Sequence, residues 1–154
     1  MLSIKSYNPL IDRERIRRDT RRVMRHVSRV LLGRRWLRKQ PKYLPFVAML
    51  EKGKTNLPHA HVLMGNHSSQ ITNERIIEVL CSLQDTLKMD IGLKPEGEER
   101  PAMSHVYDTS LVISPIYSGR VFDYVTKEAW QSEAEVNDKL ILDTEVFPWI
   151  KFTP

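Results

Sequence analysis

Two histidines separated by a single residue form the pattern with the clearest chemical potential in this chain. They are His59 and His61, within the run Pro-His-Ala-His-Val-Leu of residues 58–63, which predicts a β-strand. Successive side chains of a strand point to opposite faces, so both imidazoles lie on one face, about 7 Å apart along the strand, while Ala60 and Val62 point toward a core. Two imidazoles in this arrangement can bind a single divalent ion.

A glutamate upstream of the histidines adds a third candidate ligand. Residues 46–50 predict a second strand that ends at Glu51, and the link of residues 52–57 contains a glycine and an asparagine, which is typical of a hairpin connection. Folding of this hairpin returns Glu51 toward His59 and His61. Two imidazoles and one carboxylate suit a Mn²⁺ or Mg²⁺ centre with positions left for water or phosphate. The alternative interpretation is a polar strand face that carries two histidines by chance.

A tyrosine and a lysine further along the chain could supply a nucleophile. Residues 121–130 follow a Ser-Gly turn, contain no helix breaker and predict a helix. Tyr124 and Lys127 are three residues apart, so they share one face of that helix. A phenol with a pKa of about 10 is a weak nucleophile at neutral pH, but a metal ion that polarises a phosphodiester makes its attack feasible, and a nearby lysine helps the phenolate to form. The alternative is a tyrosine that only packs, beside a solvated lysine.

These three motifs, in this order, resemble the HUH endonucleases of the rolling-circle replication initiator (Rep) type. In that family a His-hydrophobic-His motif and an upstream acidic residue bind the metal ion, and a helix with a Tyr-x-x-Lys motif carries the nucleophile. The resemblance implies three metal ligands, Glu51, His59 and His61. It also implies that Tyr124 is the catalytic nucleophile, that Lys127 assists it, and that the chain is of the single-tyrosine type.

The function implied by this resemblance is metal-dependent nicking and joining of single-stranded DNA through a 5′-phosphotyrosine intermediate. The free 3′-OH would prime rolling-circle replication of a plasmid or phage, with single-stranded DNA or an origin hairpin as substrate and host replication proteins as candidate partners. Two alternatives stay open: an HUH transposase or relaxase, and a non-catalytic basic DNA-binding protein. A histidine-triad nucleotide hydrolase is disfavoured, because the third alternating position is Leu63 rather than a histidine.

Positive charge is concentrated at the start of the chain. Residues 1–44 carry 14 Lys and Arg against 3 Asp and Glu, a net charge of +11, whereas residues 45–154 carry 10 against 16, a net charge of −6. Most of the basic residues fall in segment 12–32, whose apolar residues at helical spacing predict a helix that begins near Asp12 and ends before Gly33. Such a helix covers a sheet with its apolar side and offers arginines to phosphates.

The basic segment contains the residues that we predict to bind nucleic acid. Three lie on the cationic side of the helix. Three follow it, where a tryptophan stands among charges, a composition that binds a phosphate backbone and stacks a base. The six residues are Arg18, Arg22, Arg25, Arg34, Arg35 and Trp36. The alternative is a solvated helix with a basic loop, and the concentration of charge favours nucleic acid.

The order of predicted elements is typical of an α+β fold. Strand, helix, two strands, helix, strand and helix match a ferredoxin-like antiparallel sheet with split βαβ topology flanked by helices, which is the kind of fold that HUH endonucleases have. The predicted elements are a strand at 2–7, a helix at 12–32, strands at 46–51 and 59–64, a helix at 72–88, strand residues at 105–107 and 111–113, and a helix at 121–130. We predict a loop at 91–101 and a single domain over 1–154 that ends in a tail at 143–154.

Composition agrees with a globular chain. Its 154 residues are 41% apolar and 28% charged, values typical of one domain around one core. The one cysteine, Cys81, excludes a disulfide framework, and we expect it to pack in the core. No apolar run approaches the ~20 residues of a membrane span, and no signal-peptide pattern opens the chain, so we expect a cytoplasmic protein without membrane contact.

Overall fold

A computed structural model shows strands and helices in the order that places the histidine strand inside a sheet. It describes residues 1–33, 44–52, 57–65, 71–94, 98, 106–116 and 140–142. The elements are β1 (Leu2–Ser6), α1 (Arg13–Leu32), β2 (Phe46–Lys52), β3 (Pro58–Met64), α2 (Asn73–Ser82), α3 (Gln84–Leu87), β4 (Asp90–Leu93), β5 (Thr109–Ile113) and β6 (Leu140–Leu142). The predicted helix at 121–130 and the predicted tail at 143–154 lie outside the described residues.

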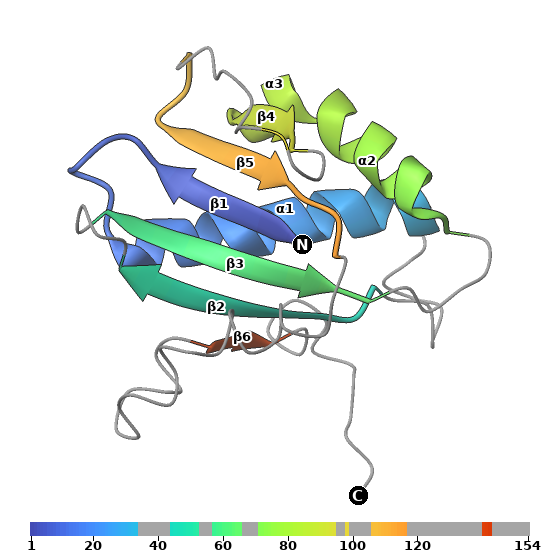
Figure 1. Ribbon diagram of the computed structural model, residues 1–154, viewed down its shortest axis with the longest axis horizontal. Coiled ribbons are helices and arrows are strands. Elements are labelled where there is room, and N and C mark those ends of the chain that lie inside the picture. The colour runs from blue at the N-terminus through green and yellow to red at the C-terminus, as the bar shows by residue number, and fades with distance from the viewer. Residues whose placement is uncertain are drawn as a thin grey trace, which may run out of the picture.

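The histidine strand β3 lies near the centre of the sheet. In the described residues the strands form one six-stranded sheet in the order β4-β5-β1-β3-β2-β6 (Figure 1). Helix α1 connects β1 to β2, and β3 lies between these two strands, which is the split βαβ arrangement. The chain then passes through α2 and α3 to the other side of β1, where β4 and β5 lie. The predicted α+β class is therefore confirmed, and the strand order is compatible with a ferredoxin-like fold.

One strand pair departs from the predicted antiparallel sheet. The edge strand β4 runs parallel to β5, whereas the other described pairs are antiparallel, so the sheet is mixed. The cause is a strand in place of part of the predicted loop at 91–101. Residues Asp90–Leu93 pair with Ser110–Ile113, which satisfies the backbone of both segments and packs Ile91 against the core. Gly92, one of the residues that indicated a loop, lies within β4.

Helix α1 begins and ends where the local sequence predicts. The carboxylate of Asp12 accepts a hydrogen bond from the backbone N–H of Arg15 at 2.8 Å and so caps the helix. Gly33, with a φ of 82°, ends it in a conformation that favours glycine. Ile16 and Val23 lie on its apolar side and are buried. No helix in the described segments is long and apolar enough to cross a membrane.

The two faces of the sheet carry different kinds of side chain. One face packs against α1 and α2 in a single core that includes Ile4, Leu50 and Ala60, each at most 1% exposed. Figure 1 shows α1 crossing behind β1 and β3. Because side chains alternate along a strand, the neighbours of these core residues project from the other side. We call this side the polar face and define it by Ser3, Lys5, Glu51, His59 and His61.

The predicted helix at 72–88 is divided in two. Helix α2 ends at Ser82, and the short α3 that follows is closed by Lys88 in a left-handed conformation with a φ of 57°. Cys81 is exposed, so its predicted place in the core is wrong. Its neighbour Leu80 is fully buried, and one residue of helix turns the side chain by about 100°, which directs Cys81 to the surface.

A carboxylate on α1 is buried at some cost in stability. Asp19 is 5% exposed and accepts a hydrogen bond from Nε of Arg15 at 3.2 Å. Burial raises the pKa of Asp19 above its usual value, and the guanidinium of Arg15, followed by those of Arg22 and Arg18, lowers it by a smaller amount. The folded chain therefore holds a proton on Asp19 more readily than the unfolded chain. The stability that depends on this proton is present below the unfolded pKa and is lost as pH rises through the folded pKa.

We expect the stability of Asp19→Asn relative to the wild-type chain to rise as pH increases from about 4 to 7. The wild-type chain loses stability when its buried carboxyl group ionises, whereas the amide of the variant does not ionise. Urea denaturation of both proteins across this range measures the difference in the free energy of unfolding. Glu74→Gln is the control of opposite sign, because hydrogen bonds from its own backbone and from Thr72 lower the pKa of Glu74. A stability difference for Asp19→Asn that does not change with pH would contradict the burial argument.

Candidate metal centre

The three predicted metal ligands meet on the polar face of the sheet. The register of β2 and β3 places Glu51 directly opposite His59, and His61 follows two residues along the same strand. Oε2 of Glu51 lies 3.2 Å from Nε2 of His59 and 3.7 Å from Nε2 of His61. One ligand atom from each residue lies within 4.8 Å of the others. The hairpin thus brings two imidazoles and a carboxylate to within reach of one ion, as the spacing in the sequence predicts.

The cluster is buried, so its carboxylate requires a positively charged partner, which a cation would supply. Glu51 is 2% exposed and His61 is 4% exposed, while the side chain of His59 is 14% exposed. A buried carboxylate is costly unless it is paired or coordinates a metal ion. Among the described residues, no hydrogen-bond donor reaches Oε1 of Glu51, although this atom is buried. The residues present therefore fit a divalent cation, which would give that oxygen a partner.

The ring of His61 is held from its far side. Nδ1 of His61 and Oγ of Ser3 form a hydrogen bond of 3.0 Å between neighbouring strands, where the two residues are direct cross-strand partners. When Nδ1 carries the proton and donates it to Ser3, Nε2 keeps the lone pair that a metal ion requires. The rings of His59 and His61 are nearly perpendicular, at 87°, with centroids 5.1 Å apart. Ser3 therefore orients one ligand while the crossed rings let both approach the same point.

The donor set also discriminates between the two expected ions. Mg²⁺ prefers oxygen ligands and retains its water, whereas imidazole nitrogen suits softer divalent ions. Two histidines beside one carboxylate could hold a divalent ion, and their nitrogen donors would suit Mn²⁺ better than Mg²⁺. With three protein ligands, coordination positions remain for water or for a substrate oxygen.

Five of the residues assigned from the sequence lie outside the described part of the chain. They are Arg34, Arg35, Trp36, Tyr124 and Lys127. The catalytic roles of Tyr124 and Lys127, and the nucleic-acid contacts of the other three residues, stay predictions.

The arginines predicted on α1 lie away from the metal cluster. Arg18 and Arg25 are exposed, and Arg22 is half-buried with Nη2 donating a hydrogen bond to the carbonyl of Thr86 at 2.6 Å. Helix α1 packs on the apolar side of the sheet, whereas the cluster is on the polar face. The structure therefore does not bring these arginines and the three ligands together, and a single nucleic-acid segment would have to pass around the sheet to contact both.

Two residues of β1 belong to the site although the sequence did not single them out. Ser3 is the cross-strand partner of His61, and Lys5 is the cross-strand partner of His59. The alternation of Leu2, Ser3, Ile4 and Lys5 shows that the two polar residues share a face. That they face the histidines depends on the pairing of β1 with β3, which no local pattern predicts.

Comparisons with protein-family models, with characterised proteins and with solved structures found no match to this chain. The resemblance to HUH endonucleases is therefore carried by the motif residues alone.

We expect Mn²⁺ to raise the Tm of the wild-type chain and to leave that of the variant with both His59→Ala and His61→Ala unchanged. A ligand at 100 times its dissociation constant stabilises the folded state by about 2.7 kcal/mol, which corresponds to a rise in Tm of about 5–11 °C for a chain of this length. Scanning calorimetry with Mn²⁺ and with a chelator measures the shift. His26→Gln is the matched control, since His26 lies on α1 and its Nδ1 bonds to the carbonyl of Arg22. An equal rise in Tm for the double variant would exclude this site.

Proposed function

We propose that the chain is a divalent-metal-dependent enzyme that nicks and rejoins single-stranded DNA at the start of rolling-circle replication. The observation that carries the proposal is the cluster of Glu51, His59 and His61, with a buried carboxylate oxygen that lacks a donor among the described residues. The same cluster would serve an HUH transposase or relaxase. These enzymes differ from a replication initiator in the DNA that they cleave.

The residues around the cluster suit an anionic substrate. Glu51 neutralises part of the charge of a divalent ion, so the centre keeps a positive charge toward an incoming phosphodiester. Lys5 adds a further positive charge next to His59 on the same face. A bound divalent ion supplies Lewis-acid polarisation of the phosphodiester. Ser3 keeps His61 in one orientation, so the ligand geometry does not have to reorganise during the reaction.

The resemblance assigns the covalent step to Tyr124. Its phenolic oxygen would form a bond to phosphorus while the bond from phosphorus to the 3′ oxygen breaks. The phenol proton is lost to solvent, and the leaving 3′ oxygen takes up a proton. The products are a 5′-phosphotyrosine and a free 3′-OH, and reversal of the same step rejoins the strand. Lys127 would stabilise the phenolate as it forms.

A second tyrosine, Tyr107, offers a natural control. Its hydroxyl donates a hydrogen bond to Oδ1 of Asp85 at 2.9 Å. This hydrogen bond, followed by burial and by the negative charges of Asp85 and Asp90, raises the pKa of Tyr107. A raised pKa disfavours the phenolate, so Tyr107 is poorly suited to be the nucleophile.

We expect Tyr124→Phe to abolish both cleavage and the covalent protein–DNA adduct, because it removes the attacking oxygen without changing the ring. Lys127→Ala should slow the reaction and still yield the adduct, since the metal ion carries most of the charge stabilisation. The measurement is a denaturing gel of full-length protein with single-stranded origin DNA and Mn²⁺, followed by mass spectrometry of the linked peptide. Tyr107→Phe should leave the adduct intact. An adduct on Tyr107 or Tyr117 would refute the assignment of Tyr124 as the nucleophile. If no tyrosine forms an adduct, the proposed enzymatic activity is refuted.

The arginine side of α1 favours a second candidate, a non-catalytic DNA-binding protein. Arginines recur every three or four residues along this helix, so their side chains form a stripe on one side of it. The stripe consists of Arg15, Arg18, Arg22, Arg25 and Arg29. It spans about 21 Å at 1.5 Å per residue, a length over which several backbone phosphates can be met. This surface would bind nucleic acid whether or not the metal centre is active.

We expect replacement of Arg18, Arg22 and Arg25 by Gln to reduce the salt dependence of DNA binding. On single strands log K changes by roughly 0.7 per phosphate neutralised for each unit of log salt concentration, so three lost contacts should flatten the slope by about 2. Fluorescence anisotropy with labelled single-stranded DNA at several salt concentrations measures the slope. A slope equal to that of the wild type would show that the stripe faces solvent in the complex.

A further inference from the structure

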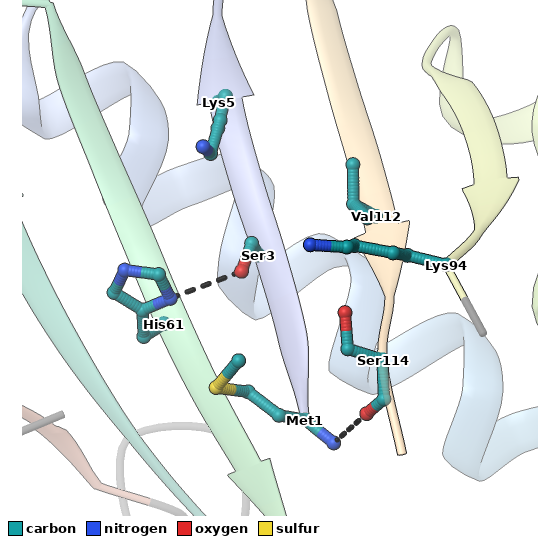
Figure 2. Close-up of a pocket in the computed structure, with 7 residues that line it drawn as sticks. All are labelled: Met1, Ser3, Lys5, His61, Lys94, Val112 and Ser114. Atoms are coloured by element: carbon teal, nitrogen blue, oxygen red, sulfur yellow. Dashed lines mark hydrogen bonds between the residues drawn. The ribbon is translucent and has the colours of Figure 1, made fainter. Parts of the chain in front are cut away.

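A small pocket opens on the polar face beside the metal cluster. Its volume is about 160 Å³, and its wall includes His61, which belongs to both the pocket and the cluster. Ser3 and Val112 line its floor from β1 and β5, and Ser114 closes one end (Figure 2). The backbone amino group of Met1 is held at that end by a hydrogen bond to the carbonyl of Ser114 at 2.8 Å.

Two lysines reach this pocket from different strands. Lys5 projects from β1, and Lys94 follows directly after β4, with β5 between them in the sheet. Figure 2 shows the side chain of Lys94 extending across β5 in the direction of β1, and both Lys94 and Ser3 line the pocket. Both lysines are half-buried, which limits their hydration and strengthens their effect on an anion in the pocket.

None of the described residues that line the pocket is acidic. Two acids stand in the same cross-strand row as Lys5: Glu51, beyond His59 on one side, and Asp90, beyond Ser110 on the other. Asp90 is buried and accepts a hydrogen bond from the backbone N–H of Tyr107 at 3.4 Å, and it does not line the pocket. The part of the lining that the structure describes therefore carries two lysines and no carboxylate.

We propose that this pocket binds a phosphate group, with Lys5 and Lys94 as its cations and the hydroxyls of Ser3 and Ser114 as further donors. When His61 donates its Nδ1 proton to Ser3, the hydroxyl proton of Ser3 points away from the ring and is available to a phosphate oxygen. Two ammonium groups and hydroxyl donors are typical of phosphate recognition.

The size of the pocket restricts what it holds. Sites for drug-sized ligands enclose roughly 300–1,000 Å³. A pocket of about 160 Å³ therefore takes a group and not a whole nucleotide. We infer that this group is a backbone phosphate next to the one at the metal centre, because His61 is common to both places. The identity of this source rests on the proposed function, whereas the phosphate site itself does not.

The first experiment tests the phosphate site alone. Full-length protein in a chelator is titrated with inorganic phosphate, and binding is followed by the ³¹P linewidth. Lys94→Gln should weaken binding about tenfold, the effect of losing one charge-assisted hydrogen bond, and Lys5→Gln should weaken it by a similar factor. Lys94→Arg keeps the charge and should bind within about threefold of the wild type.

Arg75→Gln is the matched control, because Arg75 is on α2, is about half exposed and pairs with Glu78. It removes one positive charge far from the pocket and should not change phosphate binding. Lys94→Gln with wild-type affinity and an unchanged Tm would overturn the proposal. An equal loss in Arg75→Gln would also overturn it, since the effect would then come from net charge.

The second experiment identifies the source of the phosphate. A short single-stranded oligonucleotide and a 5′-mononucleotide are compared as competitors of inorganic phosphate. Tighter, Lys94-dependent binding of the oligonucleotide supports the backbone phosphate of a strand. Tighter, Lys94-dependent binding of the mononucleotide assigns the site to a free phosphate monoester. His59→Ala distinguishes the proposed phosphate site from the proposed nicking activity. It should abolish metal-dependent cleavage and leave phosphate binding in the presence of a chelator unchanged.

Discussion

The pairing of β2 with β3 in one register is the constraint on which the site depends. This register places Glu51 opposite His59 and at the same time packs Leu50 and Ala60 into the core. A slip of one residue would turn every side chain of a strand to the other face, which would drive both histidines into the core and expose its apolar residues. The hydrophobic pattern that folds the hairpin is thus the same pattern that assembles the three residues that could hold a metal ion. Stability and ligand geometry are linked because they use alternate positions of the same two strands.

The sheet separates two kinds of chemistry. Helices α1 and α2 cover one face with apolar contacts, and the polar face gathers the carboxylate, the imidazoles and two lysines. Strand β1 serves both sides, since Leu2 and Ile4 enter the core while Ser3 and Lys5 contribute to the site. Buried polar groups are costly unless they are paired. A metal ion at the cluster and a phosphate in the pocket would offset that cost. The positive metal ion and the negative phosphate would then lie next to each other.

The positive charge of the N-terminal region is divided between these faces. Most of its arginines are on α1, on the apolar side of the sheet, whereas Lys5 lies on the polar face beside His59. The arginine stripe and the metal centre are consequently two surfaces and not one continuous path. A nucleic acid that engages both would wrap around an edge of the sheet, or two segments of it would bind to opposite sides. This arrangement explains why composition alone indicates a basic partner surface without locating it relative to the chemistry.

The sequence by itself determined the features that depend on neighbouring residues. The alternation around His59 and His61, the return of Glu51 through a hairpin, and the limits of α1 at Asp12 and Gly33 all follow from local periodicity and capping. Only the tertiary structure decided that β4 is a parallel edge strand, that β1 brings Ser3 and Lys5 beside the histidines, and that Lys94 joins Lys5 at one pocket. The physical reason is that strand order is set by contacts between distant segments, which carry no signal in the pattern of either segment alone.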